Sequence, residues 1–154
     1  MTSNTQKFNE QVLQYTKSGS APGRMAGTGE APIAIGFLHD AIKYQEEGYK
    51  DLVFTAAEEG TGYEIGAVAI IKNAPDQEAA KMFVDWSLSK EAQEIGRTVG
   101  SFQFLTNSKA TPPEQAITLK DTELIDYDFT WAADHRAEFL EKFMELTKTT
   151  PPTK

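Results

Sequence analysis

The sequence contains no cysteine among its 154 residues. This absence excludes disulfide bonds, zinc–thiolate centres, iron–sulfur clusters and cysteine nucleophiles. The chain also lacks a Gly-Xaa-Ser-Xaa-Gly elbow, a Walker loop and a His-Glu-Xaa-Xaa-His motif. Each of these motifs would bring together groups that activate a nucleophile, a phosphate or a metal-bound water. We therefore predict that the protein is not an enzyme and uses no cofactor.

Basic residues are few and scattered. Lys and Arg number 15 against 23 Asp and Glu, which gives a formal net charge of −8. Binding to a nucleic acid needs a surface that neutralises phosphates, and this sequence has no basic cluster to supply one. DNA, RNA and acidic membranes are therefore poor partners.

Long hydrophobic runs are also missing. The longest run, residues 65–71, is far shorter than the roughly 20 residues that a membrane-spanning helix needs. Residues 1–7 are polar and do not contain the apolar core of a signal peptide. We expect any export signal to lie outside this sequence.

The remaining composition is that of a folded protein. Hydrophobic residues make up 40% of the chain and charged residues 25%, and Gly and Pro together contribute 11 + 7 = 18 positions. A chain of this length can enclose one core or two small lobes. Disorder and fibrous structure are excluded by the same figures.

Hydrophobic spacing and capping residues predict both helices and strands. Helices are expected over residues 3–16, from Ser20 to about 27–29, over 40–47, from Asp76 to 86, from Ser89 to 96 and over 131–146, with a frayed end at 150–154. Strands are expected over residues 31–37, 52–55 and 63–72, with a mostly irregular stretch at 100–127.

Alternating strands and helices predict an α/β fold with a mostly parallel sheet and flanking helices. Three or four strands are few for a sheet that must be covered on both faces. The chain also begins in a helix, without a preceding strand for a first βαβ unit. These features are typical of the later part of a larger protein.

A first candidate site is the segment Ser18, Gly19, Ser20 and Ala21. Glycine allows the backbone to approach a ligand, the serine hydroxyls can donate hydrogen bonds, and amides at a helix start carry partial positive charge. This combination favours an anion. The alternative is a simple turn in which the Ser20 hydroxyl caps its own helix.

A second candidate is the pair His39 and Asp40, which follows the apolar stretch 33–37. Open α/β sheets place their ligands at the carboxyl ends of buried strands. The alternative is that Asp40 caps the next helix and His39 is a surface residue. The second histidine, His135, lies among charged residues and is expected to be solvated.

A third candidate is the turn around Gly60 and Gly62, which carries the polar residues Glu59, Thr61 and Tyr63. Two glycines allow the backbone to turn sharply. Such a segment can be a hinge, a binding loop or an ordinary surface turn.

Taken together, these segments resemble the solute-binding proteins of bacterial ABC importers, in the ferric-iron, phosphonate and sugar-phosphate branch of the type II clamshell proteins. The resemblance rests on QYTKSGSAP (14–22), IGFLHDA (35–41), EGTGYEIG (59–66), EAAKMFVDW (78–86), SKEAQ (89–93) and DYDFTW (126–131). It covers nearly the whole chain but only the C-terminal half of such proteins.

The resemblance implies two lobes that trap a ligand between them. Residues 1–58 would form part of the second, ligand-cradling lobe, and residues 59–154 would form the hinge crossing and the C-terminal part of the first lobe. It also implies a periplasmic protein or an extracellular lipoprotein.

Carried over by resemblance, Ser18, Gly19, Ser20 and Ala21 would hold an anionic group. His39, Asp40 and Glu59 would contact ligand hydroxyls or an amine, and Thr61 and Tyr63 would also belong to the ligand-binding residues. The resemblance thus implies a protein that binds a small anionic solute, such as a phosphate ester or phosphonate, for delivery to an ABC permease.

Two alternatives remain open. One is a ferric-iron or other metal-binding transport protein, with His39, Asp40 and Tyr63 as ligands, although the adjacent tyrosine pair of the iron-binding members is missing. The other is a truncated fragment that no longer transports a solute. Unpaired edges and apolar faces also predict a homodimer, with or without exchanged segments, or pairing with a separate N-terminal half.

Overall fold

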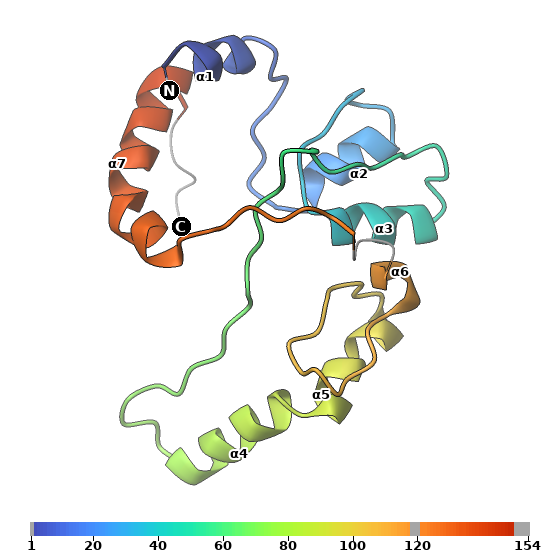
Figure 1. Cartoon of the computed structure of the whole chain (residues 1–154), viewed down its shortest axis with the longest axis vertical. Coiled ribbons are helices and arrows are strands. Elements are labelled where there is room, and N and C mark those ends of the chain that lie inside the picture. The colour runs from blue at the N-terminus through green and yellow to red at the C-terminus, as the bar shows by residue number, and fades with distance from the viewer. Residues whose placement is uncertain (1, 118–120, 150–154) are drawn as a thin grey trace.

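The computed structural model describes residues 2–117 and 121–149, so the predicted frayed end at 150–154 lies outside the described residues. The described chain is mostly helical and open in shape (Figure 1). Its helices are α1 (Thr2–Asn9), α2 (Ala21–Gly27), α3 (Leu38–Glu46), α4 (Gln77–Ser87), α5 (Lys90–Glu94), the 3₁₀ turn η1 (Gly96–Val99), α6 (Glu114–Ile117) and α7 (Phe129–Thr147).

The prediction of an α/β fold with a mostly parallel sheet is wrong for this chain. Residues 31–37, 52–55 and 63–72 contain no strand, and none is found elsewhere in the described ranges. A single isolated parallel bridge joins Thr61 to Leu124. A strand requires a neighbour that completes its backbone hydrogen bonds, and hydrophobic sequence alone does not supply one. These three stretches have no such neighbour here.

The helices form small groups joined by long connections (Figure 1). Helix α1 packs against α7, α2 and α6 pack against α3, and α4 continues into α5 and η1. The Thr61–Leu124 bridge ties together the two connections that cross between these groups. In this bridge the Thr61 amide donates to the Glu123 carbonyl at 3.0 Å and the Ile125 amide donates to the Thr61 carbonyl at 3.1 Å. The lobe boundary at residue 58 remains a prediction. The α1–α7 and α3–α6 contacts each join residues on opposite sides of it.

Two predicted helix caps are confirmed. The Asp76 carboxylate accepts from the Ala79 amide at 2.8 Å, and the Ser89 hydroxyl oxygen accepts from the Ala92 amide at 3.2 Å. Each satisfies an amide that has no partner within its own helix. Asp128 caps α7 in the same way, through the Trp131 amide at 2.8 Å. That cap was not predicted from the sequence.

The first helix is shorter than predicted, ending at Asn9 rather than near residue 16. The apolar spacing that predicted a longer helix has a different origin. The Tyr15 ring packs edge-on against Phe143 of α7, with ring centroids 5.4 Å apart. Its hydroxyl donates to the Asn9 side chain at 3.0 Å. The irregular chain after α1 therefore follows α7 without being helical.

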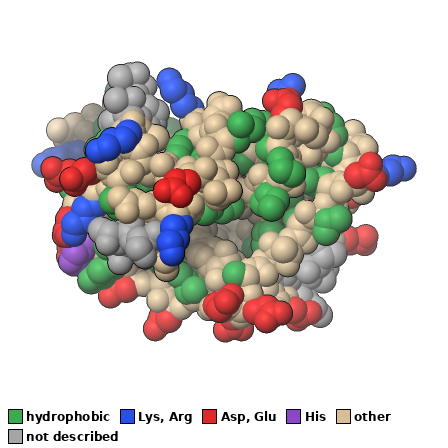
Figure 2. Space-filling view, turned by 90° about the horizontal axis from the view of Figure 1, so that it is seen from above, with side chains coloured by type: hydrophobic (Ala, Val, Ile, Leu, Met, Phe, Trp, Pro, Cys, Tyr) green, Lys and Arg blue, Asp and Glu red, His purple; other side chains and the backbone are tan. Residues whose placement is uncertain are grey.

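The buried core is small. Its hydrophobic members among the described residues are Ile42, Tyr44, Phe102 and Ala116. The chain exposes 12228 Å², whereas a compact protein of 17.0 kDa exposes about 7,700 Å². The excess includes hydrophobic side chains, visible as green surface in Figure 2. Val53 and Ile33, in two of the predicted strands, are 86% and 83% exposed.

Candidate ligand-binding site

The serine segment ahead of α2 keeps its hydroxyls free of the helix. The Ser18 and Ser20 hydroxyl oxygens lie 3.0 Å apart. Ser20 is the N-cap residue of α2, but its side chain makes no capping hydrogen bond. The alternative in which this hydroxyl caps its own helix is therefore not what the structure shows. The two hydroxyls form a hydrogen bond with each other and make no contact with the helix amides.

The amides at this helix start contribute less than the sequence predicted. The Ala21 amide donates to the Ser18 carbonyl at 3.3 Å, and Pro22 has no N–H. The Ser20 carbonyl is fixed in turn, because it accepts from the Tyr44 hydroxyl of α3 at 3.1 Å. The segment is thus held against α3, and the serine hydroxyls are its main donors.

Phe37 connects the serine segment to the histidine. A Cβ atom built on Gly19 would lie 2.7 Å from Cε2 of the Phe37 ring, so the ring fills the space beside that glycine. The same ring stacks on the His39 imidazole, with centroids 5.2 Å apart and planes inclined by 19°. Phe37 is not among the site residues predicted from the sequence. An aromatic ring two positions before a candidate histidine was the available signal.

His39 and Asp40 lie in the first turn of α3. The N-cap residue of that helix is Phe37, without a side-chain capping bond, so Asp40 does not serve as its cap. His39 Nε2 is 3.8 Å from Asp40 Oδ1, and the two side chains are 27% and 19% exposed. Both polar groups are thus half-buried and are not ordinary surface residues.

A cavity of about 230 Å³ opens beside this pair. His39, Asp40 and Lys43 of α3 line one wall, and residues 99–103, from the last residue of η1 onward, line the other. The Nε2 atoms of Gln103 and His39 are 3.3 Å apart across it. Donors, an acceptor and a cation therefore converge on one cavity, which suits a small polar ligand.

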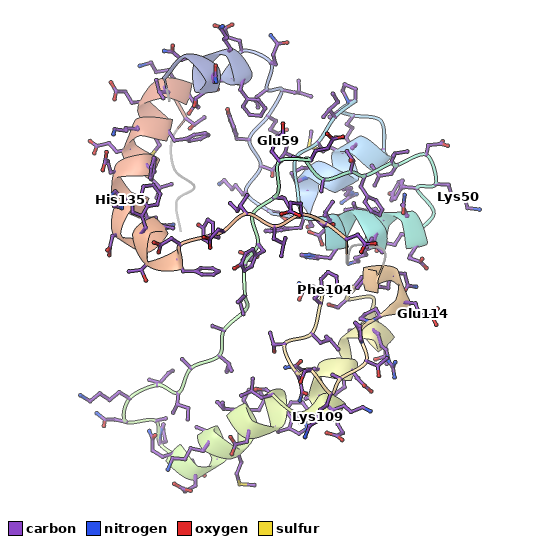
Figure 3. All side chains as sticks on the ribbon, in the orientation of Figure 1. Lys50, Glu59, Phe104, Lys109, Glu114 and His135 are labelled. Carbon is purple, nitrogen blue, oxygen red and sulfur yellow. The ribbon has the colours of Figure 1, made fainter. Side chains whose placement is uncertain are left out.

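The third candidate segment is placed elsewhere. The backbone of Thr61 is used in the bridge to Leu124. The Tyr63 ring packs edge-on against Phe129 with centroids 5.5 Å apart, and against Tyr127 at 6.3 Å. Glu59 is exposed on the turn before the bridge, at the crossing in Figure 3. The structure thus joins Ser18–Ser20 to His39–Asp40 but does not bring Tyr63 to them.

The position of Tyr63 argues against the alternative of a metal-binding protein. Tyr63 belongs to an aromatic cluster and not to the cavity of His39 and Asp40. Within residues 2–117 and 121–149, no group of three or more His, Asp or Glu side chains is placed to hold a metal ion. The proposed ligand set of His39, Asp40 and Tyr63 therefore has no geometric support.

His135 lies on α7, apart from this site (Figure 3). Its Nδ1–H donates to the Trp131 carbonyl at 2.8 Å, and its ring stacks on Trp131 with centroids 4.4 Å apart. This histidine therefore serves the local packing of α7.

In the part of the chain that is described, no helix is long and apolar enough to cross a membrane.

Comparison with known proteins gives a consistent result. The sequence profile of the bacterial extracellular solute-binding protein family matches residues 1–94. A protein of Haemophilus influenzae without an assigned function is 42% identical over 146 residues, which cover 92% of this chain and 42% of that protein.

A solved structure extends the comparison to three dimensions. The periplasmic binding protein AfuA of Actinobacillus pleuropneumoniae, with exogenous fructose-6-phosphate bound, is 41% identical and superposes with a TM-score of 0.85. The match covers 95% of this chain and 46% of AfuA. The chain thus spans less than half the length of each of these two relatives.

These matches confirm the resemblance drawn from the sequence. The family is described as one of solute-binding proteins and not of enzymes, in agreement with the prediction that the chain is not an enzyme. The chain belongs to the bacterial extracellular solute-binding protein family.

Proposed function

We propose that this chain forms the C-terminal part of an exported protein that binds a sugar phosphate and delivers it to an ABC permease. The observation that carries the proposal is the 41% identity and the TM-score of 0.85 to a protein solved with fructose-6-phosphate. The same comparison supports a periplasmic location. The proposal further assigns the phosphate to Ser18–Ala21 and the sugar hydroxyls to His39, Asp40 and Glu59.

The geometry supports assigning the phosphate and the sugar hydroxyls to different residues. Two neighbouring hydroxyls at 3.0 Å can both donate to one phosphate group. A carboxylate accepts hydrogen bonds but does not donate them, so Asp40 suits sugar hydroxyls and repels a phosphate. The Phe37 ring lies between the two groups and holds both. A ligand with a phosphate at one end and hydroxyls along its carbon chain matches the order of the serine segment, Phe37 and the His39–Asp40 pair.

Native mass spectrometry of the chain purified without refolding tests the proposal directly. A retained sugar phosphate would appear as a mass increment, and titration calorimetry with fructose-6-phosphate and inorganic phosphate would give the affinities. We expect the sugar phosphate to bind more tightly. Absence of binding for both ligands would contradict the proposal for this chain.

Removal of the two hydroxyls tests the phosphate contact. Ser18→Ala combined with Ser20→Ala should weaken binding by about 1–3 kcal/mol, the cost of leaving a buried polar partner unsatisfied. Ser108→Ala, on an exposed turn outside the site, is the matched control. Unchanged calorimetric affinity in the double variant would remove the serine segment from the site.

A further inference from the structure

The cavity wall opposite α3 is held in place by a turn and a buried side chain. Gly100 adopts the left-handed conformation, with φ of 76°, and the Ser101 amide donates to the Gly96 carbonyl at 3.0 Å. The next residue, Phe102, is one of the few buried hydrophobic side chains and is 8% exposed. This anchor fixes the position from which Gln103 extends toward His39.

The contact between Gln103 and His39 restricts where the imidazole carries its proton. The Gln103 Nε2 is an NH₂ group and can only donate, so at 3.3 Å the His39 Nε2 must accept. A neutral imidazole that accepts at Nε2 carries its proton on Nδ1. Gln103 in this orientation therefore selects one of the two tautomers of His39.

Asp40 favours the other tautomer of His39. Its carboxylate oxygen lies 3.8 Å from His39 Nε2 and favours a proton there. A neutral ring cannot both accept from Gln103 at Nε2 and carry a proton there for Asp40. The Gln103 NH₂ group lies within hydrogen-bond distance of this nitrogen at 3.3 Å, whereas the Asp40 oxygen at 3.8 Å does not, so Gln103 sets the tautomer. A side chain at position 103 that cannot donate would leave only the Asp40 carboxylate beside Nε2.

We propose that Gln103 is a positioning residue of the ligand site, which fixes the ring and the tautomer of His39, and that residues 99–103 form the wall against which the sugar phosphate is enclosed. The assignment rests on the proposed function for the identity of the ligand. The positioning of His39 by Gln103 rests on the geometry alone. Lys43, which lines the α3 wall and lies 3.8 Å from Glu47, adds a cation to the cavity.

Two variants of Gln103 test the positioning role. Gln103→Leu removes both the donor and the acceptor at similar size, and Gln103→Glu keeps only acceptors. Nitrogen chemical shifts of the His39 ring, measured by NMR on the ligand-free chain at a pH where the ring is neutral, report the protonated nitrogen. The wild type should show the proton on Nδ1, and both variants should move it to Nε2. An unchanged ring signal in both variants would overturn the proposal.

Calorimetry with fructose-6-phosphate tests the binding role separately. Gln103→Leu should lower affinity roughly tenfold, since one well-formed hydrogen bond is worth about that factor. Gln6→Leu, at an exposed position of α1, is the control and should bind like the wild type. Circular dichroism of each variant checks that it is folded.

The outcomes of the two experiments separate the two proposals. A wild type that does not bind sugar phosphates, but whose His39 tautomer depends on Gln103, contradicts the proposed function and supports the positioning role. A wild type that binds, with Gln103→Leu equal in affinity and tautomer, overturns the positioning role and leaves the proposed function standing.

Discussion

Gly19 is required for space, because the Phe37 ring occupies the position that a side chain would take. The calculated Cβ position at 2.7 Å from that ring is closer than real Cβ atoms approach. Gly19→Ala should displace Phe37 and, through the ring stack, His39. We expect a loss of about 1–3 kcal/mol in stability, as for other overpacked sites, together with weaker sugar-phosphate binding.

The matched control for this substitution is Gly66→Ala. A Cβ atom at Gly66 would meet nothing within 4 Å, so this variant should be neutral in both urea unfolding and calorimetry. If Gly19→Ala behaved like Gly66→Ala in both measurements, the contact between the serine segment and Phe37 would be irrelevant to the site.

Asp40 should determine selectivity between ligands. If its carboxylate accepts from sugar hydroxyls, Asp40→Ala should weaken fructose-6-phosphate binding by roughly 1.5–3 kcal/mol, the usual range for a hydrogen bond to a charged group. Binding of inorganic phosphate should change little, because only the larger ligand reaches Asp40. Equal losses for the two ligands, measured by calorimetry, would assign Asp40 a structural role instead.

At the scale of elements, the Asp128 cap sets the start of the longest helix. α7 extends over 19 residues, and Asp128 satisfies the Trp131 amide in its first turn. Asp128→Ala should cost about 1 kcal/mol in urea unfolding, the typical value for a lost N-cap. Asp128→Asn retains a capping oxygen and should lose much less. Equal losses in the two variants would mean that the charge of Asp128, and not its cap, is what matters.

Glu94 links α5 to the chain before α6, and this link should depend on pH. Its carboxylate accepts from the Thr111 amide at 2.8 Å, and Lys90 and Arg97 lie 3.8 and 3.6 Å away. The Thr111 hydrogen bond is the main cause that lowers the pKa of Glu94 below its usual value of 4.5, and the two cations lower it further while partial desolvation opposes them. A carboxyl group with a lowered pKa in the folded state stabilises the fold above its unfolded pKa.

The contribution of Glu94 should therefore be present at neutral pH and be lost as the pH falls below about 4.5 through the lower, folded-state pKa. Glu94→Gln keeps an acceptor for Thr111 but carries no charge. The melting temperature of this variant should fall less than that of the wild type between pH 6 and pH 3, as thermal unfolding can measure. Glu91→Gln, on the same helix, is the control. A parallel pH dependence of the wild type and Glu94→Gln would contradict this role.

At the scale of the whole molecule, the excess exposed surface predicts association. The chain exposes about 4,500 Å² more than a compact protein of its mass. Ile33, Val53 and Ile71, all in stretches predicted as strands, are each at least 79% exposed. Exposed apolar side chains in such stretches are covered by association when the chain itself does not cover them. We expect light scattering at micromolar concentration to show a dimer, or a complex when a complementary N-terminal half is present.

The two forms of association can be separated by experiment. The portion of the Haemophilus influenzae relative that lies outside its match to this chain can be added as the complementary half. Its binding should reduce self-association and the fluorescence of a hydrophobic dye. A compact monomer that unfolds cooperatively on its own, and binds neither dye nor the added half, would contradict the prediction.

Local sequence was sufficient to predict most helices and to single out the candidate residues of the central site, whose role stays a prediction. Asp76 and Ser89 cap the helices for which they were predicted, because a cap needs only the residue and the amides directly after it. The serine segment and His39–Asp40 were likewise visible as polar groups at turns. Phe37 and Gln103 were not, because their roles depend on side chains that come from distant parts of the chain.

The sequence by itself determined the helix starts and the absence of thiol chemistry, since these follow from residue identity and short-range spacing. The family was indicated by the resemblance of several segments to known proteins. Only the tertiary structure decided that residues 31–37, 52–55 and 63–72 are unpaired here, because pairing depends on a neighbouring strand that short-range pattern does not reveal. It also decided that Tyr63 packs with Tyr127 and Phe129 while His39 faces Gln103. Contacts between distant residues are fixed by how the whole chain folds, and local spacing does not determine them.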